Sequence, residues 1–230
     1  MAANGPRGPE TPGGFPFRLI TVDVDGTLTR VHGWRAIAQA FGREPEFDAT
    51  NRRFFAREIS EDEHLRNLLD IAVGHTVSEV ERVLEATPVI GGIGETVREL
   101  HQRGSRVALL THNPLYVAHW YQRRFGFDDA EGTDGRWVVD GQIRDGGPVR
   151  ADKRSGLARL RARWGASPPE VAHVGDGWAD AKLFPLVGAG ISLNSRLPDV
   201  DRAADAAVHA ESLTAILPIL DHLTPRAGVE

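Results

Sequence analysis

The sequence contains no cysteine among its 230 residues, which excludes disulfide bonds, thiolate nucleophiles and thiolate metal sites. It also lacks an apolar run of about 18 residues, so neither a membrane-spanning helix nor a membrane partner is expected. Positive charge is not in excess, because 27 Lys and Arg against 32 Asp and Glu give a net charge of −5. A nucleic-acid partner is therefore not expected either.

The hydrophobic content of 41% is enough for one substantial domain, or for one domain with a smaller one inserted. Residues 1–16 are rich in Gly and Pro and lack the apolar segment of a secretory signal, so they are predicted to form a disordered leader. Residues 224–230 are predicted to be a flexible tail. A cytoplasmic location follows as an expectation, whereas the choice between monomer and homodimer stays open.

Two carboxylates follow the first predicted strand, the apolar run 18–21. Asp23 and Asp25 are two residues apart, and in an extended chain such side chains point to the same face. Gly26 lets the chain leave the strand, and Thr27 adds a hydroxyl beside the acids. Because like charges repel, this pair requires a cation or a shared proton. The alternative is a strand end whose acids only cap loops.

Phosphoryl transfer is the chemistry that suits this pattern. One carboxylate can attack phosphorus and carry the phosphoryl group as an aspartyl-phosphate. A second can protonate the leaving oxygen and then deprotonate the attacking water. A magnesium ion offsets the negative charge of the phosphoryl oxygens. The motif therefore favours a Mg²⁺-dependent enzyme.

The next segment, residues 33–88, shows only helical patterns. Trp34, Ile37 and Ala38 recur at helical spacing, and two capping boxes, beginning at Ser60 and Thr76, start further helices. We interpret this segment as a small, all-helical cap, inserted directly after the acid pair where it can cover the site. Residues 17–32 and 89–223 are assigned to the core domain.

From residue 93 onward, helices alternate with strands. Strands are predicted at 106–110, 171–174 and 188–194, helices lie between them, and a helix over 213–223 closes the domain. Asp140-Gly141 predicts a hairpin turn. The fold class is therefore α/β, with a Rossmann-like parallel sheet covered by helices on both faces.

Polar side chains follow several of these strands. In parallel sheets, sites form at the carboxyl ends of the strands, which all meet at one edge. The residues expected to converge there are Asp23, Asp25, Thr111, Lys153 and Asp176. Lys153 is predicted in the first turn of a helix, where a cation is unfavourable unless it faces an anion.

These motifs resemble those of the haloacid dehalogenase (HAD) superfamily of phosphohydrolases, and most closely its phosphoserine-phosphatase-like branch with a small helical cap. The resemblance extends from about residue 17 to about residue 220. The matching motifs, in order, are Asp23-Val24-Asp25-Gly26-Thr27, Thr111, Lys153, and Gly175-Asp176-Gly177-Trp178-Ala179-Asp180.

The resemblance implies a role for each matching residue. Asp23 would be the nucleophile and Asp25 the general acid/base. Thr111 would bind the phosphoryl oxygens, and Lys153 would hold the nucleophile and the phosphate together. Dehalogenases of the superfamily lack the second acid, so dehalogenation is not expected here.

The resemblance also implies a magnesium site. Asp23, the backbone carbonyl of Asp25, and Asp176 would hold Mg²⁺. Asp180 would assist through water or through Lys153.

Several positions depart from phosphoserine phosphatases. His32 and Leu68 stand where those enzymes carry the Glu and Arg that receive the substrate's amine and carboxylate, and Thr111-His112-Asn113 replaces their Ser-Gly-Gly. Ala179 replaces their Asn. We therefore expect Thr27, His112, Asn113 and His32 to be candidate substrate-binding residues, and the substrate to differ from phosphoserine.

The leading hypothesis is a Mg²⁺-dependent phosphomonoester hydrolase acting on a small phosphorylated metabolite through an aspartyl-phosphate. A phosphotransferase or phosphomutase with the same intermediate is the alternative. The third hypothesis is a non-catalytic regulator that binds a phosphorylated ligand.

Overall fold

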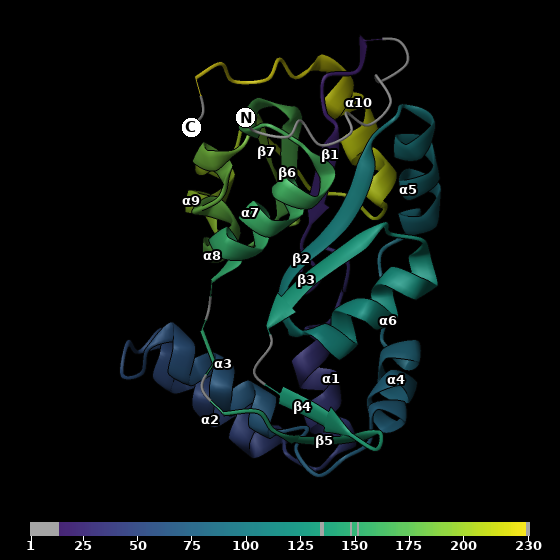
Figure 1. Ribbon diagram of the computed structural model, residues 1–230. Coiled ribbons are helices and arrows are strands. Elements are labelled where there is room, and N and C mark those ends of the chain that lie inside the picture. The colour runs from purple at the N-terminus through teal and green to yellow at the C-terminus, as the bar shows by residue number, and fades with distance from the viewer. Residues whose placement is uncertain (1–13, 134–135, 148, 151, 229–230) are drawn as a thin grey trace, which may run out of the picture.

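The computed structural model describes residues 14–133, 136–147, 149–150 and 152–228, and its centre is a parallel sheet. The sheet has six strands in the order β3-β2-β1-β6-β7-β8, and all their pairings are parallel (Figure 1). The strands are β1 (Leu19–Val22), β2 (Arg106–Pro114), β3 (Asp129–Thr133), β6 (Val171–Gly175), β7 (Ala189–Leu193) and β8 (Ala206–Val208). The predicted fold class is confirmed.

Helices cover both faces of this sheet because its central strands are buried on both sides. Within β1, Leu19 packs in one hydrophobic cluster, with Leu157 and Leu160 of α7. Ile20 and Val22 point to the opposite face and pack in the other cluster. That second cluster contains the apolar faces of α5, α6 and α10. The four helices are α5 (Ile93–Gln102), α6 (Leu115–Phe125), α7 (Lys153–Trp164) and α10 (Ile216–His222).

Four of the five helices between β1 and β2 gather beyond one end of the sheet (Figure 1). Their buried side chains, including Trp34, Ile37 and Leu69, continue the main hydrophobic core. Thr76 forms a complete capping box with Glu79, and the Ser60 hydroxyl accepts from the Glu63 N–H. The helices are α1 (Gly33–Ala40), α2 (Glu44–Phe55), α3 (Glu61–Asp70) and α4 (Val77–Ala86).

A hairpin from the second half of the chain packs against these helices. It consists of β4 (Arg136–Val139) and β5 (Gln142–Asp145), and the predicted turn has positive φ at Asp140 and Gly141. The Ile143 N–H donates to His75 O at 2.8 Å, and Ile143 O accepts from the Gly74 N–H at 2.9 Å. Two segments about 70 residues apart in sequence are thereby joined, as the lower part of Figure 1 shows.

Some elements were not predicted. Strand β3 has the sequence Asp-Ala-Glu-Gly-Thr, which carries no apolar alternation, and its pairing with β2 holds it in the sheet. Strand β8 has only three residues and is an edge strand. The short elements are α8 (Trp178–Ala181), α9 (Pro198–Ala203) and the 3-10 turns Pro168–Glu170, Phe184–Leu186 and Leu213–Ala215.

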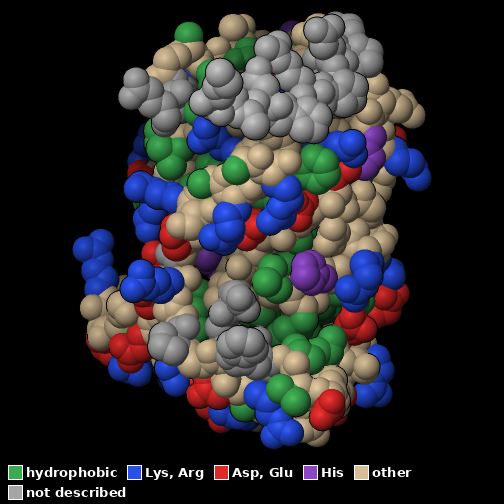
Figure 2. All heavy atoms as spheres, in the orientation of Figure 1, with side chains coloured by type: hydrophobic (Ala, Val, Ile, Leu, Met, Phe, Trp, Pro, Cys, Tyr) green, Lys and Arg blue, Asp and Glu red, His purple; other side chains and the backbone are tan. Residues whose placement is uncertain are grey.

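The two ends of the chain and its surface complete the description. Most of the predicted leader, residues 1–13, lies outside the described residues. In the predicted tail, the Arg226 N–H donates to Gly188 O at 2.9 Å. Basic and acidic side chains are interspersed on the face shown in Figure 2. Within the described residues, no helix combines the length and apolar character needed to cross a bilayer.

Substitution of Gly132 tests how closely β2 and β3 are paired. A Cβ added there would lie 2.5 Å from the backbone oxygen of Asn113, so the strands would have to separate. We expect Gly132→Ala to lower the free energy of unfolding by about 1–3 kcal/mol, measured by urea denaturation. Gly94→Ala is the control, because the nearest atom to its Cβ lies at 3.9 Å. Equal stability of the two variants would contradict this account.

Candidate active site

The candidate site lies where the carboxyl ends of β1, β2 and β6 meet. Asp23 follows β1, and its N–H donates to Val174 O of β6 at 2.9 Å, which ties the two strand ends together. Asp176 follows β6, Thr111 lies within β2, and Lys153 begins α7. The predicted convergence at this edge is therefore observed.

Three acids form a cluster at this edge. One carboxylate oxygen from each of Asp23, Asp176 and Asp180 lies within 4.8 Å of the others. Burial, with the repulsion of neighbouring acids, raises the pKa of Asp23 to about 7 and that of Asp176 to about 8. A bound cation stabilises such a cluster of carboxylates, and carboxylate oxygens are ligand atoms that Mg²⁺ prefers. The cluster therefore fits a site for a divalent metal ion.

Lys153 supplies the positive charge within the protein itself. Its Nζ lies 2.7 Å from Asp23 Oδ1 and 2.7 Å from Asp180 Oδ1, and the side chain is buried. Burial alone would lower the pKa of Lys153, but the two carboxylates outweigh it and raise that pKa. A charged Lys in the first turn of α7 is thus explained by the anions that it faces.

Asp180 is held from several directions. Its Oδ2 accepts from the N–H groups of Asp176 at 3.1 Å and Gly177 at 3.0 Å. Its Oδ1 contacts Lys153 and lies 3.0 Å from His173 Nε2. Although burial acts to raise the pKa of Asp180, Lys153 and His173 outweigh it and lower that pKa. Asp180 is therefore an anion whose position is fixed by the protein.

His173 also contacts this cluster, and it was not identified from the sequence as a site residue. It is fully buried, and burial lowers its pKa, so the imidazole is neutral. His173 Nε2 lies 3.0 Å from Asp180 Oδ1, and an ionised carboxylate only accepts, which assigns the ring proton to Nε2. The Thr21 hydroxyl lies 2.8 Å from the other ring nitrogen, Nδ1. The available signal was a histidine within an apolar strand, two residues before Gly175-Asp176.

Thr27 and Gly26 fit closely against Asp176. The Thr27 hydroxyl donates to Asp176 Oδ1 at 2.9 Å, so the structure places this candidate substrate contact on an acid of the cluster. Gly26 has φ +85°, and a Cβ there would lie 2.2 Å from Asp176 Oδ2. Only glycine accommodates both the left-handed backbone and this close approach.

The side chain of Asp25 belongs to a different group of residues. Its Oδ1 accepts from the Gly33 N–H at 2.7 Å, and its Oδ2 accepts from Asn113 Nδ2 at 3.0 Å. The Nδ1 of His32, whose side chain is half exposed, lies 3.9 Å from Asp25 Oδ2. The proposed ligand atom, the backbone carbonyl of Asp25, stays a prediction.

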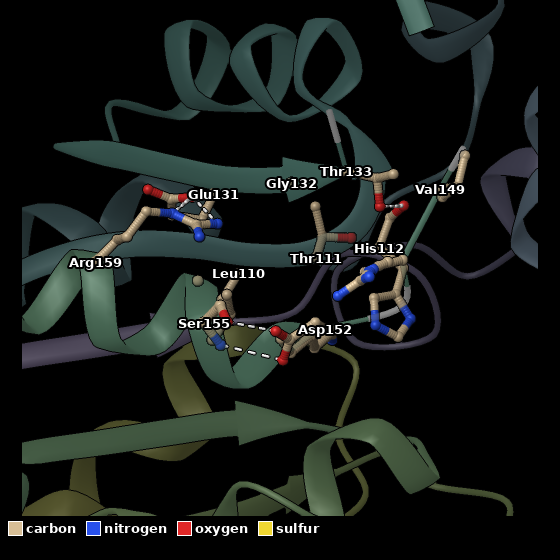
Figure 3. Close-up of a pocket in the computed structure, with 13 residues that line it drawn as sticks. Leu110, Thr111, His112, Glu131, Gly132, Thr133, Val149, Asp152, Ser155 and Arg159 are labelled. Atoms are coloured by element: carbon tan, nitrogen blue, oxygen red, sulfur yellow. Dashed lines mark hydrogen bonds and ion pairs between the residues drawn. The ribbon is translucent and has the colours of Figure 1, made fainter. Parts of the chain in front are cut away.

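His112 lies beside two cavities. The larger, of about 430 Å³, is bounded by the end of β2 and the start of α7, with Thr111, His112, Asp152 and Ser155 on its wall (Figure 3). The smaller, of about 70 Å³, lies between His112, Lys182 and Glu61 of α3. Burial, and next the charge of Lys153, lowers the pKa of His112 to about 4, so this histidine is neutral.

The model for the family described as haloacid dehalogenase-like hydrolase matches residues 17–188, well over half of the chain. This chain belongs to the haloacid dehalogenase-like hydrolases.

Relatives named phosphoserine phosphatase align with most of the chain. Those from Archaeoglobus fulgidus and Halobacterium salinarum are both 28% identical, over 212 and 209 residues, and each alignment covers 88% of this chain. The chain spans 60% of the first relative and 97% of the second. A third, from Streptomyces coelicolor, is 27% identical, and the chain spans 50% of it.

Solved structures share the fold. A HAD family hydrolase from Salmonella enterica serovar Typhi has a TM-score of 0.81 at 16% identity, covering 92% of this chain and 74% of its own. A substrate-bound phosphoserine phosphatase complex has a TM-score of 0.74 at 22% identity, covering 88% and 98%. At these identities the likeness establishes the fold alone.

The raised pKa values predict how Mg²⁺ and pH act together on stability. In metal-free protein, Asp23 and Asp176 keep protons that the unfolded chain releases near its ordinary pKa of 3.8. Their contribution to the free energy of unfolding therefore falls as the pH rises from about 4 to about 8. A divalent ion held by both carboxylates would replace these protons, so we expect added Mg²⁺ to raise the melting temperature more above pH 8 than below pH 7.

Thermal unfolding with and without Mg²⁺, at pH values on either side of this window, measures the effect. Asp176→Asn should abolish the Mg²⁺-dependent shift, whereas the surface variant Asp140→Asn, in the hairpin turn, should retain it. A shift that is independent of pH, or one that survives in Asp176→Asn, would contradict the assignment.

Proposed function

We propose that this chain is a magnesium-dependent phosphomonoester hydrolase that acts on a small phosphorylated metabolite through an aspartyl-phosphate. One observation carries the proposal. Asp23 lies in a cluster of acids that a bound cation would stabilise, whereas the side chain of Asp25, two residues later in the sequence, lies outside that cluster. Two neighbouring acids in such different surroundings suit two different tasks, nucleophile and proton carrier. Membership of a hydrolase family and the relatives named phosphoserine phosphatase support it.

In the first step, an Asp23 carboxylate oxygen attacks phosphorus while Lys153 holds Oδ1. The bond between phosphorus and the leaving oxygen breaks, and Asp25 gives that oxygen a proton. In the second step, Asp25 takes a proton from water, and the water oxygen attacks phosphorus. The bond to Asp23 breaks, which releases inorganic phosphate and restores the enzyme.

Mg²⁺ would be held by Asp23, Asp176 and the backbone carbonyl of Asp25. When bound, it supplies charge stabilisation to the phosphoryl oxygens. Both carboxylate oxygens of Asp180 accept hydrogen bonds from protein groups. In this proposal Asp180 therefore does not bind the metal ion directly, and it positions Lys153. The hydroxyl of Thr111 binds a phosphoryl oxygen.

The substrate proposal rests on the surroundings of His112. Residues 33–88 act as the cap in this proposal, and Glu61 of α3 reaches Lys182 of the core at 3.0 Å. The cavity beside this ion pair is about 70 Å³, which suits a small leaving group. Because His112 replaces a glycine of phosphoserine phosphatases, we propose a substrate other than phosphoserine.

Replacement of Asp23 tests the mechanism directly. We expect Asp23→Asn to abolish phosphate release from p-nitrophenyl phosphate, with a loss of at least about 10³-fold, because an amide cannot form the acyl-phosphate. Phosphate release in the presence of Mg²⁺ is the measurement, and Asp140→Asn is the control. Retained turnover in a folded Asp23→Asn protein would exclude the mechanism.

Replacement of His112 tests the substrate proposal. We expect His112→Gly to change kcat/KM by about tenfold or more between members of a panel of phosphorylated sugars, amino acids and nucleotides, with a relative gain for O-phosphoserine. His119→Ala is the control, since His119 is exposed on α6. If His112→Gly changes kcat/KM equally for every ester, His112 does not select the leaving group.

A further inference from the structure

Asn113 is buried near the end of β2, with 3% of its surface exposed, although it was predicted to bind substrate. Its Nδ2 donates to Asp25 Oδ2 at 3.0 Å and to Thr111 Oγ1 at 3.2 Å. A carboxylate only accepts hydrogen bonds when it is ionised, which fixes the amide with its nitrogen toward Asp25. Both N–H groups of the amide are thereby used within the protein.

The Asp25 carboxylate is held on both sides. Asn113 contacts Oδ2, and the Gly33 N–H from the first residue of α1 contacts Oδ1 at 2.7 Å. A Cβ at Gly33 would lie 2.9 Å from Asp25 Oδ1, so the fit on that side is close. The donors come from β2 and α1, which are about 80 residues apart in sequence.

We propose that Asn113 is a positioning residue that fixes the orientation of the Asp25 carboxyl for proton transfer to the leaving oxygen. This inference rests on the proposed phosphatase function. The terminal torsion of an aspartate is broad, so a carboxyl without a fixed donor samples many orientations. Proton transfer requires hydrogen-bond reach, and a small misplacement of the acid slows it strongly.

The contact with Thr111 gives Asn113 a second, separable effect. The Thr111 oxygen accepts from both the backbone N–H and the side-chain Nδ2 of Asn113, each at 3.2 Å. The Thr111 hydroxyl proton is then directed away from Asn113, toward a phosphoryl oxygen in the proposed complex. Loss of this contact would affect every phosphate ester alike, because each carries the same phosphoryl group.

Leaving groups of different basicity separate the two effects. The p-nitrophenolate anion is stable and needs little help from an acid, whereas phenolate is more basic and depends on protonation. Hydrolysis of the aspartyl-phosphate is the same step for both esters, whereas kcat/KM reports the step in which the leaving group departs. We expect Asn113→Ala to reduce kcat/KM for phenyl phosphate at least about tenfold more than kcat/KM for p-nitrophenyl phosphate, since general acid catalysis contributes about 10²–10⁴-fold. Asn113→Leu, which retains side-chain volume without a donor, should show the same pattern.

A double-mutant cycle shows whether Asn113 acts through Asp25. In an Asp25→Asn background, Asn113→Ala should cause no additional selective loss on phenyl phosphate. Asn67→Ala is the matched control, because its amide donates to Thr50 within the helices of residues 33–88. It should leave the ratio of the two kcat/KM values unchanged. Circular dichroism and cooperative unfolding establish that each variant is folded.

The outcomes separate this inference from the proposed function. If the unmodified protein hydrolyses neither ester, the phosphatase function fails. If it hydrolyses both, and folded Asn113 variants lose equal factors in kcat/KM on each ester, the positioning role is overturned. A selective loss that persists without the Asp25 carboxyl also overturns it.

Discussion

The ammonium group of Lys153 between the carboxylates of Asp23 and Asp180 is the interaction on which the candidate site depends. Two buried acids and one half-buried acid at one strand edge repel each other, and without an internal cation the cluster would lose much of its stability. Lys153 offsets part of this charge but leaves Asp23 and Asp176 with raised pKa values. A divalent ion bound to these carboxylates would stabilise the negative charge that Lys153 does not offset.

Around this ion pair, the protein separates two kinds of acid. The cluster of Asp23, Asp176 and Asp180 lies at the ends of β1 and β6, while the side chain of Asp25 is turned toward β2 and α1. The first environment concentrates negative charge, and the second surrounds one carboxyl with neutral donors. Carboxylates so close in sequence can then perform different chemistry because their surroundings differ.

Much of the fold and site could be predicted because the signals are local. Apolar strands ending in acids, glycines and a hydroxyl are visible in the sequence, and parallel sheets bring such ends together. The roles of His173 and Asn113 could not be predicted, since each depends on a partner distant in space. Strand β3 was missed because pairing with β2, and not its own composition, holds it in the sheet.

The sequence by itself determined the α/β class, the apolar strands and the order of the chemical motifs, because periodicity and turn residues act over a few positions. Tertiary structure decided which atoms meet. It placed Asn113 against Asp25, His173 against Asp180, and the hairpin against the helices of residues 33–88. These contacts join segments that no local pattern relates, and packing geometry alone sets their distances.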